Sequence, residues 1–231
     1  NLTRNAGSYQ LIPGGGSRSS VGAVTYNPLQ TLTTSFTTQL GSDGGIEIYS
    51  TNQSNVIVEI VGYYAPPGDG GLYYHPLPNS FRLIDTENPS AACLSYSQPL
   101  GSGGTHVEKG ANSCNGIMLP TTARAIVGNA TVNNLAPNPG YITFYPGQVS
   151  RPNIATLNVP LSQSATNQVI FSVGTGTIFR IYSSTRMNLA LDLTGYYSPD
   201  ANDINGAGML FYPVTGGMRL LETRIGEKGC V

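Results

Sequence analysis

Charged side chains are scarce in this chain. Lys, Arg, Asp and Glu together make up 10% of its 231 residues, and the formal net charge is −1. Proteins that bind nucleic acid need clustered cations to neutralise phosphates. The composition therefore excludes a nucleic-acid partner.

Long apolar runs and histidine are also scarce. A bilayer-spanning helix needs about 18 or more consecutive apolar residues, and the sequence has no such run. The two histidines, His75 and His106, occur without a GxSxG or HExxH pattern, so they provide no recognised nucleophile, base or zinc motif. We expect no membrane span, no enzymatic activity, no metal and no cofactor.

Gly, Pro, Ser, Thr and Asn are abundant instead, and Tyr outnumbers Phe. Apolar and polar residues alternate in short segments bounded by Gly, Pro, Asn or Ser, which is typical of half-buried strands. The clearest segments are residues 44–50, 55–64, 124–134, 140–146, 178–184 and 187–197. No segment has helical spacing with caps. The sequence predicts an all-β protein with strands of about 5 to 9 residues, of a composition typical of secreted proteins.

The chain repeats itself. Residues 1–66 align without a gap on residues 134–199, at an offset of 133, with about 19 identical positions. The match resumes at an offset of 137, where "FRLIDT" aligns with "MRLLET". We therefore expect five segments: the back part of a module (1–66), a linker (67–71), a complete module (72–199), a linker (200–208) and the front part of a further module (209–231).

The three cysteines follow the same repeat. Cys93 and Cys114 enclose a Gly-rich loop of about 20 residues, and closing such a loop contributes about 3 kcal/mol in the chain-entropy model. A thiol nucleophile or metal pair would need CxxC spacing or nearby His ligands, so a disulfide and export are expected. Cys230 aligns with Cys93, and we expect it to be free or to pair outside this chain.

The order of the motifs resembles a tandem repeat of large secreted and surface-anchored bacterial proteins. "PLPNSFRLIDT" is followed by "ARAIVGNATVNN", "GYITFYPG" and "LALDLTGYY", as units of that family open with an Arg-Leu-Leu-Asp-Thr-Arg-like segment and close with Gly-Tyr-Tyr. Glu87 and Asn88 stand where the family often has Arg, although Arg224 keeps it. The resemblance implies β-sandwich modules, jelly-roll or immunoglobulin-like, that form stalks and adhesive arrays and have no catalytic activity.

Two sets of polar side chains recur in both copies. Asp85 and Glu222, like Glu59 and Asp192, are repeated acids, and paired carboxylates can hydrolyse glycosides. Acids inside repeated strands are more often bound to backbone N–H groups or to arginine. We expect structural ion pairs of Arg82 with Asp85 and of Arg219 with Glu222.

Paired tyrosines end each module, at Tyr63 and Tyr64 and again at Tyr196 and Tyr197. Neighbouring side chains of a strand point to opposite faces, so one tyrosine of each pair should lie in the core and the other should face outward. We expect these residues to pack at the junction with the next module. The alternative is that outward tyrosines stack on sugar rings.

These features predict a structural protein outside the cell, at its surface or secreted. Partial modules expose unpaired strands, which invite a further chain. We expect the chain to be a subunit or repeat segment of a fibre, sheath or surface array in which copies join head to tail, by strand donation or within a longer parent chain. A glycan-binding or adhesion module, with a glycan as partner, is the alternative.

Overall fold

The structure is a computed structural model that describes residues 5–17, 24–38, 40–65, 70–94, 96–110, 113–114, 117–201 and 210–222. For residues 78–79, 113–114, 117–118 and 210–222 it describes the backbone. Cys230 and most of the linker 200–208 lie outside these ranges, as do the side chains of Cys114, Arg219 and Glu222.

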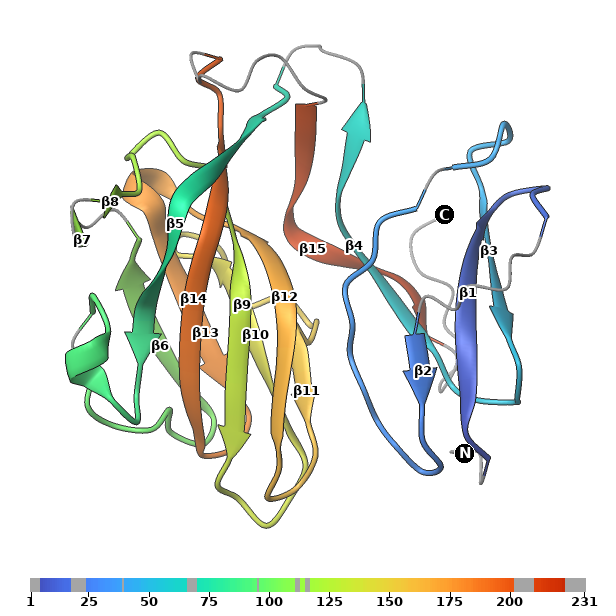
Figure 1. The fold of residues 1–231 in the computed structure, drawn as a ribbon, viewed down its shortest axis with the longest axis horizontal. Coiled ribbons are helices and arrows are strands. Elements are labelled where there is room, and N and C mark those ends of the chain that lie inside the picture. Colours follow the sequence, from blue (N-terminus) through green and yellow to red (C-terminus); the bar gives the residue numbers. More distant parts are fainter. Residues whose placement is uncertain are drawn as a thin grey trace.

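The chain is an all-β protein, as the alternating pattern predicts (Figure 1). The strands are β1 (Gly7–Pro13), β2 (Val24–Tyr26), β3 (Ile46–Ser50), β4 (Ile57–Ala65), β5 (Tyr73–Asp85), β6 (Gly104–Lys109), β7 (Ser113–Cys114), β8 (Ile117–Met118), β9 (Ala125–Asn134), β10 (Gly140–Pro146), β11 (Leu157–Val159), β12 (Ser164–Ser172), β13 (Ile178–Ser183), β14 (Met187–Ser198) and β15 (Leu210–Glu222). Two single turns of 3-10 helix, η1 (Pro89–Ala91) and η2 (Thr175–Thr177), complete the described elements. No helix in these ranges has the length and hydropathy to cross a membrane.

Two four-stranded antiparallel sheets form the larger unit. One has the order β12-β9-β14-β5 and the other β11-β10-β13-β6, and they face each other on the left of Figure 1. Strand residues alternate inward and outward, so the inward residues of both sheets make one continuous core. Its members include Phe81, Leu83, Ile126, Ala130, Val132, Ile142, Phe144, Leu157, Val159, Val169, Phe171, Phe179, Ile181, Leu189, Leu191 and Leu193.

Three phenylalanines from both sheets meet in this core. The ring of Phe144 stacks on that of Phe171 at 4.6 Å, and Phe179 packs against Phe171 at 5.2 Å. Full burial of each such side chain contributes about 1.5–3 kcal/mol. The three rings therefore help to hold the two sheets together.

Two smaller sheets lie to the right in Figure 1. One has the order β2-β1-β3, and the other is the two-stranded sheet β15-β4. Only Ile12, Tyr26 and Val58 are buried hydrophobic residues among the described side chains of β1 to β4. This part of the chain has far less core than the larger unit.

The smaller sheets reproduce the strand pairing of the larger unit. Leu11 pairs with Ile48 as Phe144 pairs with Ile181, and both residues of the second pair lie 133 positions later. Each residue pair of β1 with β2 and β3 has such a counterpart in β10 with β11 and β13. The strand registers of these sheets therefore match at an offset of 133 residues.

One strand cannot be recognised from the sequence because it contains prolines. β5 is 13 residues long and contains Pro76 and Pro78, and sequence alternation alone does not predict it. Proline is tolerated on edge strands because its absent N–H can face away from the sheet, and β5 is an edge strand. The register shifts between Pro76 and Phe81, which lets the intervening residues leave the ladder.

Candidate functional site

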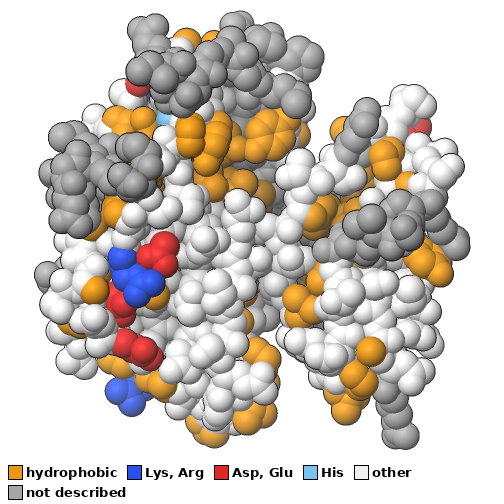
Figure 2. All heavy atoms as spheres, viewed as in Figure 1, with side chains coloured by type: hydrophobic (Ala, Val, Ile, Leu, Met, Phe, Trp, Pro, Cys, Tyr) orange, Lys and Arg blue, Asp and Glu red, His pale blue; other side chains and the backbone are white. Residues whose placement is uncertain are grey.

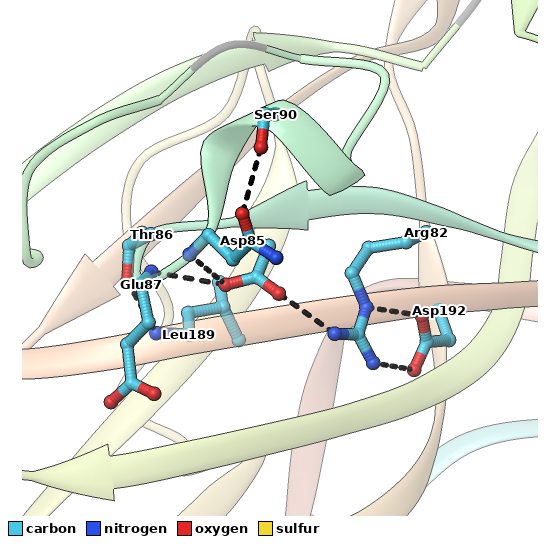
Figure 3. Close-up of polar contacts among 8 residues, drawn as sticks. Arg82, Asp85, Thr86, Glu87, Ser90, Leu189 and Asp192 are labelled. Atoms are coloured by element: carbon cyan, nitrogen blue, oxygen red, sulfur yellow. Dashed lines mark hydrogen bonds and ion pairs between the residues drawn. The ribbon is translucent and has the colours of Figure 1, made fainter.

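Arg82 ties the edge strand β5 to its neighbour β14 (Figure 3). Its Nε and Nη2 donate to the two carboxylate oxygens of Asp192 at 2.8 and 3.0 Å, and its Nη1 donates to Asp85 at 2.7 Å. Asp192 lies directly opposite Arg82 in the strand register, which is why a two-pronged pair can form. The sequence pointed to the Arg82–Asp85 pair, but the larger contact is the one with Asp192.

Asp85 also closes the turn after β5. Its Oδ1 accepts hydrogen bonds from the backbone N–H groups of Glu87 at 3.0 Å and Asn88 at 2.8 Å. Burial by itself would raise the pKa of Asp85, but the hydrogen bonds from Asn88, Arg82 and Glu87 outweigh it and lower that pKa. A general acid for glycoside hydrolysis needs a raised pKa, so Asp85 is suited to a structural role.

Thr86, the residue after Asp85, also binds β14. Its backbone N–H donates to the carbonyl of Leu189 at 3.0 Å, and its hydroxyl accepts from the Leu189 N–H at 2.9 Å. The threonine thereby extends the contact of β5 with β14 by one residue after the strand ends (Figure 3). Asp85 and Thr86 thus have a physical role, which is to fasten β5 to β14.

Tyrosines gather where the ends of β4, β5 and β14 meet. The hydroxyls of Tyr64 and Tyr197 are hydrogen-bonded to each other, and the ring of Tyr74 lies 5.1 Å from that of Tyr197. Burial, followed by the hydrogen bond and charge interaction with Tyr64, raises the pKa of Tyr197. Figure 2 shows apolar side chains clustered over this region. Because Tyr64 and Tyr197 are 133 positions apart, equivalent positions of the two copies are in contact.

The expected division of each tyrosine pair into one inward and one outward residue is wrong for the first pair. Tyr197 is 3% exposed and Tyr196 is half-buried on the ring of His75, whereas Tyr63 and Tyr64 are 53% and 40% exposed. Tyr197 packs in a small cluster with Leu72, Ala125 and Val127. The last two belong to β9, and in the described part of the chain β4 has no neighbouring strand that corresponds to β9.

Residues 31–38 belong to no strand or helix, yet they contact the larger unit. The backbone N–H of Asn158 donates to the Thr33 hydroxyl at 3.1 Å, and the Ser35 hydroxyl donates to the carbonyl of Gln168 at 2.8 Å. The side-chain amide of Asn167 donates to the Thr33 carbonyl at 3.3 Å. The segment thus lies along the β11 and β12 edges of the larger unit, held largely through side chains. A shallow groove of about 200 Å³ lies beside it.

Cys93 is disulfide-bonded and packs against the core of the larger unit. The side chain of Cys114 lies outside the described residues, so its pairing with Cys93 stays a prediction. Cys93 lies two residues after the η1 turn, and its N–H donates to the Arg82 carbonyl at 3.0 Å. The disulfide therefore sits beside the contact of β5 with β14.

Strand β15 pairs with β4 in the same register as β5 pairs with β14. Phe211 pairs with Tyr64 as Tyr74 pairs with Tyr197, and Arg219 pairs with Glu59 as Arg82 pairs with Asp192. All eight residue pairs of β15 with β4 correspond to pairs of β5 with β14, at offsets of 137 and 133, and both register shifts recur. Strands β4 and β15, which lie far apart in the chain, thus pair as β14 and β5 do.

The candidate site thus consists of strand edges and the tyrosines beside them. No group of three or more potential metal ligands occurs within the described ranges. Comparisons of the chain with models of protein families, with curated proteins and with solved structures find no match.

Proposed function

We propose that the chain is a non-enzymatic structural subunit or repeat segment of an extracellular fibre, sheath or surface array. Its units are β-sandwich modules in tandem, and copies join head to tail. The observation that carries this proposal is the pairing of β15 with β4 in the register of β5 with β14. Strands β4 and β15, which lie far apart in the chain, thereby build one composite module.

The same composite module can form between copies. β15 can pair with the β4 of its own chain or with the β4 of the next chain, and both arrangements use the same eight residue pairs. Strand addition of this kind restores backbone hydrogen bonds. A head-to-tail contact that does not close into a ring propagates as a filament. Concentration then decides between closed single chains and filaments.

Other features fit a structural role outside the cell. The disulfide at Cys93 requires an oxidising compartment. The Arg82 and Asp85 network ties the first strand of the module to its last strand. The resemblance to surface-anchored bacterial repeats, in motif order and in the repeated acid-threonine pair, points the same way.

The geometry gives less support to a glycan-binding module. Tyr49 and Tyr182 recur in both copies, but the guanidinium of Arg151 lies 3.8 Å over the ring of Tyr182. The Tyr141 ring beside it, at 5.8 Å, has Ser8 as its repeat counterpart. An aromatic platform for sugars is therefore not repeated along the chain.

A cysteine pair across β4 and β15 tests the head-to-tail joint. Tyr63→Cys combined with Tyr212→Cys places thiols on directly paired residues, within the reach of a disulfide. Thr131→Cys with Thr166→Cys is the matched control, because these hydroxyls are 2.9 Å apart inside the larger unit. Cys230→Ser is introduced in both.

After concentration and oxidation, the β4–β15 pair should give a ladder of cross-linked multiples of 24.3 kDa on a non-reducing gel. The control pair should give single chains at every concentration. Single chains from both pairs at all concentrations would show that β15 pairs within its own chain alone, and the head-to-tail assembly would be abandoned.

A further inference from the structure

We propose that Arg151 and Arg180, with Tyr141 and Tyr182 beside them, bind the carboxylate or sulfate groups of an acidic polysaccharide. The four residues belong to the sheet β11-β10-β13-β6 and to the loop between β10 and β11. This binding site goes beyond the structural role proposed above and does not depend on how copies of the chain assemble.

The strand register places Arg180 and Tyr182 on the outer face of this sheet. They are two positions apart on β13, so their side chains point to the same side. Arg180 pairs with Val107 of β6, which is 59% exposed, and this side therefore faces solvent. The acid next to Val107, Glu108, pairs with Phe179, which lies in the core. Glu108 thus points away from Arg180.

Arg180 has hydrogen-bond donors without acceptors. Its Nε is buried and has no hydrogen-bond partner, and the side chain makes no ion pair with the residues that the structure describes. Arg82, by contrast, binds two carboxylates. A buried donor without a partner is rare and calls for an explanation such as a missing ion. Because no hydrogen bond holds the present rotamer, the Arg180 side chain can turn toward a bound anion, which then accepts from Nε.

Arg151 brings a second guanidinium to the same face. It lies 3.8 Å over the ring of Tyr182, and its Nη1 donates to the Tyr141 hydroxyl at 3.4 Å. No carboxylate within the described ranges pairs with it. The donors of a guanidinium lie in its own plane, so the aromatic ring below fixes that plane and leaves N–H groups for an acceptor at its edge. A carboxylate or sulfate fits such an edge with two oxygens.

The polar character of this face favours a polysaccharide over a protein as the partner. Among the described side chains of β6, β10, β11 and β13, Val107 is the only exposed large hydrophobic residue. Protein interfaces, in contrast, centre on apolar residues that lose their water. Tyrosine and threonine hydroxyls, as of Tyr141 and Thr105, can bind sugar hydroxyls instead. Because Arg151 covers a face of the Tyr182 ring, charge rather than stacking provides the recognition.

Binding of soluble polymers to the full chain tests the site. Polygalacturonate carries carboxylate groups, dextran sulfate carries sulfate groups, and dextran is the neutral control. Binding to the immobilised chain is followed by biolayer interferometry. We expect saturable binding of one or both acidic polymers and none of dextran. The binding should be lost in 1 M NaCl, where charges more than about 3 Å apart are largely screened.

Three chain variants locate the binding. Arg180→Met removes the guanidinium but keeps most of the side-chain length, and Arg151→Gln removes the second cation at an exposed loop position. Each should weaken binding about tenfold or more, because a hydrogen bond between charged groups is lost. Arg124→Gln is the matched control, since Arg124 is an exposed arginine directly before β9 in the other sheet, and it should leave binding unchanged.

The melting temperature separates a loss of binding from a loss of fold. Arg180→Met removes no hydrogen bond and eliminates a buried donor without a partner, so its melting temperature should equal or exceed that of the native chain. A clear decrease would contradict the unpaired state of Arg180.

The possible results are distinct. Failure of both acidic polymers to bind, or equal losses in Arg180→Met and Arg124→Gln, would overturn the site. Equally tight binding of polyglutamate would show that an acidic peptide fits as well, and the polysaccharide would be abandoned as the partner. None of these results bears on the β4–β15 joint, because that joint consists of other strands.

Discussion

Replacing Asp85 by asparagine tests the reasoning about the network that holds β5 in place. The Asp85 side chain is 7% exposed and accepts three hydrogen bonds, two from backbone N–H groups on Oδ1 and one from Arg82 on Oδ2. In Asp85→Asn the amide oxygen can still accept from both N–H groups. The amide nitrogen, however, would face the Arg82 guanidinium. Both groups are hydrogen-bond donors, so no hydrogen bond can form between them.

The expected change in the free energy of unfolding follows from the loss of the hydrogen bond between Arg82 and residue 85. A hydrogen bond to a charged group contributes about 1.5–3 kcal/mol. Arg82 keeps its two bonds to Asp192, and its side chain is 39% exposed, so water can solvate the freed N–H. We therefore expect Asp85→Asn to lower the free energy of unfolding by about 2 kcal/mol at pH 7.

The effect should depend on pH with a defined sign. Because the pKa of Asp85 is lowered in the folded state, its carboxylate stabilises the fold above the unfolded pKa of about 3.9. That contribution is lost as the pH falls through the lowered folded value. The difference between the native chain and Asp85→Asn should thus be complete at pH 7 and should shrink below about pH 4.

Urea unfolding at several pH values, followed by circular dichroism because the chain has no Trp, measures this difference. Glu87→Gln is the matched control. The exposed Glu87 accepts hydrogen bonds from the Asn133 and Asn188 amides through one carboxylate oxygen, which glutamine can replace, so a change under about 0.5 kcal/mol is expected. An Asp85→Asn effect that stays constant down to pH 3, or one as small as that of the control, would refute the argument.

Three further predictions concern the larger unit. Gly128→Ala should lower the melting temperature strongly, because its Cβ would lie 2.2 Å from the Asp192 carbonyl oxygen, whereas Gly101→Ala, which meets nothing within 4 Å, should leave it nearly unchanged. Phe179→Ala should cost about 3–5 kcal/mol in urea unfolding, because the ring is fully buried; a cost below 1 kcal/mol would contradict the assigned core. The raised pKa of Tyr197 means that the fold loses stability as the pH rises above about 10. Tyr197→Phe should make stability less dependent on pH in that range, and an unchanged alkaline profile would count against the buried hydroxyl.

The sequence by itself determined the strand content and the repeat. Alternation of apolar and polar residues depends on the two-residue period of a strand, so β3, β4, β9, β10, β13 and β14 were predictable within about two residues. The offsets of 133 and 137 were likewise visible in identical residues. Both signals are local or repeated, and neither requires knowledge of which strands become neighbours.

The tertiary structure decided which strands pair and therefore which residues are buried. Sequence alternation places Tyr64 and Tyr197 in equivalent positions, yet one is exposed and the other is buried, because only Tyr197 has the side chains of β9 beside it. The pairing of β15 with β4 likewise joins segments about 150 residues apart in the chain. Backbone hydrogen bonds between strands do not depend on how far apart the strands lie in the sequence. A strand edge therefore pairs with whichever complementary strand the fold brings to it.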